Sequence, residues 1–184
     1  MDKILTYGLP ILVIFLIILY LVSTYNKLIA QREFVRNAMG NIAAQIESRW
    51  DAVKNMIDAT KKYSEHEAGL LTDITAKRSR VSQTSSPQEI NADDNLFEQA
   101  VSRINVVAEN YPQLKADQVY VKSMDAVDKY ENNVRTSRMI FNDTVTKFNR
   151  NVLQFPSSII AKLFGFGEME YFKNTDTKTD MPSW

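Results

Sequence analysis

The stretch AENYPQLKA, residues 108–116, decides the fold because it separates two strongly helical patterns with one of only five prolines in the chain. A residue that precedes proline is driven out of the α region, so the first helix is expected to end at Asn110 and Tyr111. Tyr111 and Leu114 would hold the turn against neighbouring helices. Since a helix stop of this kind needs no ligand, Tyr111, Pro112 and Leu114 are predicted to form a structural turn.

Both sides of this turn carry apolar residues at the spacing of an amphipathic helix. Before it, Ser86 to Glu89 have the arrangement of a capping box with Pro87 at the first helical position, and Asp93 is the alternative N-cap. After it, a helix is expected to begin near Asp117 or Gln118 and to stop at Pro156. The apolar positions of the two helices are Leu96, Phe97, Ala100, Val101, Ile104, Val107, Tyr120, Met124, Val127, Val134, Phe141, Val145, Phe148 and Val152.

A longer apolar seam precedes these two helices, and no proline occurs between Pro10 and Pro87. One unbroken helix is therefore expected from residue 24 to residue 82. The apolar members of the seam are Val35, Met39, Ile42, Ile46, Val53, Met56, Tyr63, Leu70, Ile74 and Val81. Interruptions occur at Arg49, Thr60, Glu67 and Lys77. Three amphipathic helices cannot bury their apolar stripes alone, so antiparallel packing through short loops is expected.

The N-terminal run ILTYGLPILVIFLIILYLV, residues 4–22, contains no charged residue. As a helix it would span roughly 28 Å, close to the ~30 Å hydrocarbon core of a bilayer. A cleaved signal peptide is the alternative, but only Lys3 precedes the run and no small-x-small cleavage site follows it, which favours an uncleaved anchor. Pro10 is expected near the first turn of the helix, which tolerates proline. The anchor residues are Ile4, Leu9, Pro10, Ile11, Phe15, Tyr20 and Val22.

The distribution of charge bears on orientation and partners. Lys27, Arg32 and Arg36 follow the apolar run, and this local excess over the N-terminal side favours a cytoplasmic large domain. Basic and acidic side chains balance at 22 each, so no overall field would hold a nucleic acid, and nucleic acid is excluded as a partner. The chain has no cysteine, which excludes disulfides and thiolate chemistry.

These patterns predict an all-α protein in which an N-terminal transmembrane helix is followed by a long-helix antiparallel bundle. The expected parts are an anchor at 1–24, a bundle at 25–156, an apolar C-terminal segment at 157–172 and a disordered tail at 173–184. Contiguous exposure of the apolar segment would mark a partner or membrane surface, whereas packing on its own bundle would bury it. We expect the segment to help hold copies together. Its candidate interaction residues are Ile159, Ile160, Leu163, Phe164, Phe166, Tyr171 and Phe172.

Catalytic and metal-binding patterns are sparse. His66 is the only histidine, and a bundle di-iron site would need Glu-x-x-His on two helices, whereas Tyr63 stands three residues before His66. No phosphate loop, nucleophile elbow or H-E-x-x-H pair occurs. We therefore predict no cofactor, no metal and no enzymatic activity, with acid–base catalysis by His66 and a nearby carboxylate as the remaining alternative. Asn142 and Asn149, two helical turns apart, either set helix register or lie at the surface.

Four ordered segments resemble the LemA family of bacterial membrane-anchored helical proteins. They are YSEHE (63–67), AENYPQLKA (108–116), FNDTVTKFN (141–149) and FPSSIIAKLFGF (155–166), and the resemblance extends from the anchor to about Phe172. The family usually carries a proline in the segment that matches RWDAVKNMIDA, where this chain has Lys54. The resemblance implies an N-terminal span in the bacterial cell membrane and a long-helix bundle, but no settled activity. It also suggests a membrane protease of the HtpX type as a partner class.

The leading functional hypothesis is a single-pass, membrane-anchored, non-enzymatic scaffold. It would self-associate into a homo-oligomer and organise or recruit other membrane or envelope proteins. The alternative is a membrane-anchored sensor or receptor that binds a small molecule or peptide in the helical bundle. A sensor should present a concave pocket between helices, whereas a scaffold should bury helix faces in neighbouring copies.

Overall fold

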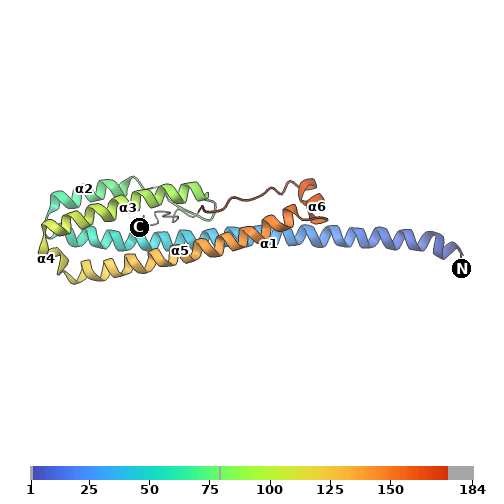
Figure 1. Ribbon diagram of the computed structural model, residues 1–184, viewed down its shortest axis with the longest axis horizontal. Helices are drawn as coiled ribbons and strands as arrows, with labels where there is room; N and C mark the ends of the chain where they lie inside the picture. Colours follow the sequence, from blue (N-terminus) through green and yellow to red (C-terminus); the bar gives the residue numbers. More distant parts are fainter. Residues whose placement is uncertain (1, 79, 174–184) are drawn as a thin grey trace, which may run out of the picture. The chain divides into compact units, whose positions relative to one another are not determined.

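The computed structural model describes residues 2–78 and 80–173, with side chains from Tyr7 onward. Throughout these residues the chain forms helices and connecting segments without a strand, which confirms the all-α prediction (Figure 1). The helices are α1 (Asp2–Lys61), α2 (Glu65–Ala76), α3 (Pro87–Asn110), α4 (Pro112–Lys115), α5 (Gln118–Leu153) and α6 (Ser157–Leu163). The predicted tail beyond Lys173 lies outside the described residues.

The chain divides into two compact units. Of the described residues, unit 1 contains those up to Val35 together with Asn142–Glu170, and unit 2 contains Arg36–Phe141 and the few that follow Glu170. The long helices α1 and α5 contribute residues to both units.

The first soluble helix is shorter than the sequence pattern indicates. An unbroken helix to residue 82 was expected, but α1 ends at Lys61 and α2 begins at Glu65. Ser64 causes the break, since its backbone is extended and its hydroxyl accepts a hydrogen bond from the Glu67 N–H at 3.3 Å, as an N-cap does. The new start changes the buried face, so Ala68 and Leu71 are buried in α2 in place of the predicted Leu70.

The capping box at the start of α3 is confirmed. The Ser86 hydroxyl accepts from the Glu89 N–H at 3.2 Å, and the Glu89 carboxylate accepts from the Ser86 N–H at 2.8 Å. Two of the backbone donors at the helix start are thereby satisfied. Asp93, the alternative cap, lies inside α3 and is buried.

The core of unit 2 is built from one apolar stripe on each long helix. Full burial of each large side chain stabilises the folded state by about 1.5–3 kcal/mol. The stripes contribute Met39, Ile42, Ile46, Val53 and Met56 from α1, Phe97, Ala100, Ile104 and Val107 from α3, and Tyr120, Val127, Val134 and Phe141 from α5. α2 packs against α3.

Unit 1 combines the N-terminal part of α1 with the end of α5 and with α6. Its buried apolar residues are Leu28, Val35, Val145, Phe148, Val152, Ile160, Ala161 and Phe166. Among the described residues, α1 is the one helix long and apolar enough to cross a membrane. Pro10 lies inside α1 rather than in its first turn, because the helix already begins at Asp2.

Candidate functional site

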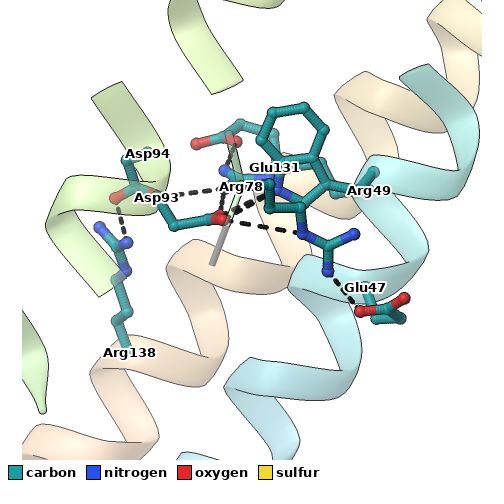
Figure 2. A network of polar contacts seen from close by, with 8 residues as sticks. Glu47, Arg49, Arg78, Asp93, Asp94, Glu131 and Arg138 are labelled. Atoms are coloured by element: carbon teal, nitrogen blue, oxygen red, sulfur yellow. Dashed lines mark hydrogen bonds and ion pairs between the residues drawn. The ribbon is translucent and has the colours of Figure 1, made fainter. Parts of the chain in front are cut away.

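A buried ionic network occupies the middle of unit 2 and joins α1, α3, α5 and the connection after α2 (Figure 2). Its centre is Arg49 of α1, whose side chain is only 1% exposed. The Arg49 guanidinium donates to Glu131 of α5 at 2.6 Å and to Asp94 of α3 at 2.9 Å, and it lies 3.5 Å from Asp93. The planar fork of an arginine suits such simultaneous contacts. One side chain therefore ties three helices together.

Two further arginines complete the network around Asp93 and Asp94. Arg138 of α5 pairs with Asp94. Arg78, in the connection between α2 and α3, pairs with Glu47 and lies 3.8 Å from Asp93. Three guanidinium groups thus face four carboxylates, and each of these charged groups has an opposite partner.

Aromatic rings close the network from the apolar side. The Trp50 indole N–H donates to both carboxylate oxygens of Asp93, at 3.1 and 3.0 Å. The Arg49 guanidinium carbon lies 3.9 Å from the centre of the Phe97 ring, and the Trp50 and Phe97 rings meet edge to face at 5.4 Å. Arg49 and Asp93, the centre of the network, are therefore enclosed by the helices that the network connects, whereas Glu47 and Glu131 reach the surface.

Burial raises the pKa of Asp93, and this effect exceeds the opposing influence of the Trp50 hydrogen bond and of Arg49 and Arg78. Such a shift often marks catalytic groups, but ion-pair networks cause it as well. Here the carboxylate contacts an indole and two guanidinium groups of its own chain. This arrangement suits alignment of helices better than proton transfer to a substrate.

In unit 2, Asp117, the residue after AENYPQLKA, contacts Lys62 and Tyr63, the first residue of YSEHE. Its carboxylate accepts from the backbone N–H groups of Val119 at 2.8 Å and Tyr120 at 3.3 Å, which caps α5. The other oxygen accepts from Lys62 at 3.2 Å and from the Tyr63 hydroxyl at 3.4 Å. The Val119 N–H is the main cause of a lowered Asp117 pKa. YSEHE and the residue after AENYPQLKA therefore join the α1–α2 turn to the start of α5.

The three predicted turn residues occupy the short connection between α3 and α5. Tyr111 is half-buried and follows the last residue of α3, Pro112 begins α4 and is exposed, and Leu114 is fully buried. The turn is therefore itself one short helix.

His66 is exposed near the start of α2. In the described part of the chain, no group of three or more histidine, aspartate and glutamate side chains is placed to hold a metal ion.

The end of α6 turns the chain back onto unit 1. Gly165 has φ +72°, and the Phe166 N–H donates to the Ala161 carbonyl at 2.8 Å, as in a Schellman motif. Phe166 then lies 5.9 Å from Tyr25 and 6.5 Å from Phe148, measured between ring centres. A residue with φ below zero at position 165 would direct the chain elsewhere.

Asn149 holds the segment after Phe166. Its amide donates to the Met169 carbonyl and its amide oxygen accepts from the Met169 N–H, both at 2.8 Å. The side chain is buried, which is against surface placement, and it bonds the backbone of the segment after α6 rather than a neighbouring helix.

The candidate interaction residues divide into two groups. Ile160, Phe166 and Phe172 are buried, and Phe172 belongs to unit 2, where its ring meets that of Phe141 at 5.1 Å. The exposed group consists of Ile159, Leu163, Phe164 and Tyr171.

Of the anchor residues, Ile4 lies outside the described side chains. The others, Leu9, Pro10, Ile11, Phe15, Tyr20 and Val22, are exposed along α1.

Sequence reasoning missed the ionic network. Arg49 was noted only as an interruption of an apolar seam, and Asp93 only as a rival cap. The sequence does contain a hint of the network. Arg49 lies on the apolar face of α1, and the pair Asp93 and Asp94 lies on the apolar side of α3, so a buried ion pair between these helices could have been predicted. The pairing of Arg49 with Glu131 and of Asp94 with Arg138 could not be read from local spacing, because Glu131 and Arg138 belong to α5, far along the chain.

Comparisons with known proteins agree with the segment pattern. A model of the LemA family matches residues 38–183. Protein LemA of Metamycoplasma hominis is 24% identical over 159 residues, which cover 84% of this chain and 71% of that protein. Magnetosome protein MamQ 2 of Paramagnetospirillum magneticum is 28% identical over 80 residues, or 44% of this chain and 29% of that protein. MamQ of Magnetospirillum gryphiswaldense is 27% identical over 79 residues, covering 43% and 29% respectively.

Proposed function

Because the chain belongs to the LemA family, we propose that it is a single-pass, membrane-anchored, non-enzymatic scaffold that self-associates and organises or recruits other membrane or envelope proteins. The observation that carries this proposal is α1. Its exposed apolar stretch has the length of a membrane span, and the same helix continues into the buried core of unit 2.

The chemistry of the described residues supports a non-enzymatic role. The buried charged groups of unit 2 are engaged with one another around Arg49, and the LemA family is not known as a family of enzymes. Similarity to proteins named after the magnetosome is in keeping with a part in a larger assembly.

Self-association has a candidate surface on α5. Met139 and Ile140 are adjacent large apolar residues that are 65% and 55% exposed. Neighbouring exposed apolar side chains mark contact surfaces more often than single ones do. We infer that this part of α5 contributes to contacts between copies.

The test is the mass of the full chain extracted in mild detergent, measured for the wild type and for Met139→Ser with Ile140→Ser. We expect an oligomer whose mass falls in the double variant, while Val106→Ser, which changes a comparably exposed valine on α3, leaves it unchanged. A wild-type monomer without companion proteins contradicts the scaffold proposal.

The proposal also places the large domain in the cytoplasm, on the basis of Lys27, Arg32 and Arg36. Because the native chain has no cysteine, one cysteine introduced between residues 174 and 180 reports sidedness in intact cells. Protection from an impermeant thiol reagent is expected, and ready labelling reverses the orientation. Recovery of an HtpX-type membrane protease with the tagged full chain is the corresponding test of the partner class.

A further inference from the structure

Unit 1 exposes a group of large apolar side chains at the end of α5 and along α6. We define this group as the apolar foot, and its members are Leu153, Phe155, Ile159, Leu163 and Phe164. Leu163 is 72% exposed and Phe155 is 76% exposed. Several large apolar side chains exposed within one short segment are a candidate protein or membrane contact.

The foot lies beside the point where the apolar stretch of α1 ends. The Phe164 and Tyr25 rings are 4.8 Å apart, and Tyr25 follows Val22, the last residue of the apolar run, by roughly 4.5 Å of helix rise. The end of α5 is held to the same part of α1, since the Asn151 amide donates to Gln31 at 2.9 Å. Figure 1 shows α6 lying against α1 within unit 1. A bilayer that contains residues 4–22 would therefore have its interface at the level of the foot.

The charges around the foot match an anionic lipid surface. Residues 23–32 and 144–167 contain five basic residues and no acidic residue, although the whole chain is balanced. The five are Lys27, Arg32, Lys147, Arg150 and Lys162. The nearest acidic residues along the chain, Glu33, Asp143 and Glu168, lie just outside these ranges. Basic residues next to a membrane span are attracted to anionic headgroups.

The other side of α6 is already used for packing. Ile160 and Ala161 are buried, and the Schellman turn at Gly165 brings Phe166 into the unit 1 core. These contacts, together with the Phe164 ring against Tyr25, hold α6 in place without help from Ile159 or Leu163. The exposed side chains are thus presented by a fixed support, which lets a helix too short to bind lipid alone take part in a membrane contact.

We propose that the apolar foot inserts into the interfacial layer of the leaflet next to unit 1, with the surrounding basic residues on anionic lipid headgroups. This inference rests on the membrane span of the proposed function. The proposal assigns a lipid surface as the partner of the C-terminal segment. A contact between copies is one of the other outcomes that the test distinguishes.

The experiment uses the full chain in lipid nanodiscs, with an environment-sensitive dye on single introduced cysteines. Leu163→Cys reports the foot, Ile14→Cys reports the centre of the span, and Asp143→Cys is the matched control, because Asp143 is also exposed in unit 1 but lies about 15 Å of helix rise before Leu153. Each sample is measured with and without lipids that carry a nitroxide quencher on the acyl chain. We expect strong quenching at residues 14 and 163 and weak quenching at residue 143.

The outcomes separate the foot from the span. Quenching at residue 14 together with equal, weak quenching at residues 163 and 143 overturns the foot and leaves the span intact. Absence of quenching at residue 14 overturns the span and with it the inference. The dye at residue 163 could also report an apolar environment that lipid quenchers do not affect. If that apolar signal disappears in discs that hold one copy, the foot contacts another copy, and the inference is overturned.

The charge preference has its own measurement in the Leu163→Cys chain. In discs that contain phosphatidylglycerol, Lys162→Gln is expected to reduce the ratio of inserted to withdrawn dye roughly fivefold. This is the change in an equilibrium constant expected when one basic residue is lost from an anionic surface. In discs of phosphatidylcholine alone, the same change should have little effect. An equal effect in both lipids overturns the assignment of anionic headgroups.

Discussion

Replacing Arg49 by methionine removes the centre of the ionic network while keeping a long side chain on the buried face of α1. Removal of one partner from a buried ion pair costs about 3–5 kcal/mol of folding free energy, because the other charge stays buried without compensation. We expect a loss near the lower end, about 3 kcal/mol. Arg78 and Arg138 still face Asp93 and Asp94, and water can solvate Glu131, whose side chain is 45% exposed.

The pH dependence provides a second check on the same variant. Burial raises the pKa of Asp93 above its ordinary value of 3.8, so the folded state binds this proton more tightly than the unfolded state. The contribution of Asp93 to stability is therefore present at low pH and is lost as pH rises through the raised pKa. Without Arg49 the ionised carboxylate is less well compensated. The penalty of Arg49→Met should be largest near neutral pH and should shrink as Asp93 takes up its proton.

The assay is urea unfolding of the full chain in detergent, followed by tryptophan fluorescence. A Trp184→Phe background leaves Trp50 as the one tryptophan, and its indole contacts Asp93 directly. Lys54→Met is the matched control, since Lys54 is an exposed residue of α1 and its replacement should change stability by no more than about 0.5 kcal/mol. An Arg49→Met chain within about 1 kcal/mol of the wild type, or no more affected than the control, would refute the reasoning.

Three further changes test other parts of the molecule. Because His66 is exposed, His66→Ala should change stability by no more than about 0.5 kcal/mol and leave assembly intact, as measured by melting temperature and oligomer mass. Loss of a specific activity in the folded variant would instead support the enzyme alternative. Asp117→Asn should reduce the acid sensitivity of the fold, because the lowered pKa of Asp117 means that its stabilising contribution is present above its ordinary pKa of 3.8 and is lost as pH falls through the folded pKa. Wild-type and variant melting temperatures should therefore converge in acid. Asn149→Ala should cost about 1–3 kcal/mol and increase hydrogen exchange at the Met169 N–H, because it removes both bonds to that backbone; unchanged exchange there would contradict the assigned contact.

Much of the helical architecture could be predicted because its signals are local. Ser86, Pro87 and Glu89 form a capping box within four residues, and Pro112 ends a helix through its own ring geometry, so neither needs information from distant residues. The apolar run at residues 4–22 is equally local, since length and lack of charge suffice to identify a candidate span. The apolar periodicity does not predict the break before Ser64, because the periodicity continues across it, while one side-chain hydrogen bond caps the start of a new helix.

The sequence by itself determined the all-α class and the candidate span, because each depends on residues that are near one another in the chain. It also determined the family, because four short segments in a fixed order along the chain are enough for that resemblance. Only the tertiary structure decided which partners Arg49 has, since Asp94 and Glu131 come from two other helices and their distances depend on how those helices pack. It likewise decided which half of the C-terminal segment is buried. Ile160 and Leu163 are both apolar, and what distinguishes them is the face of α6 that packs on unit 1 and the turn at Gly165 that brings Phe166 into the core.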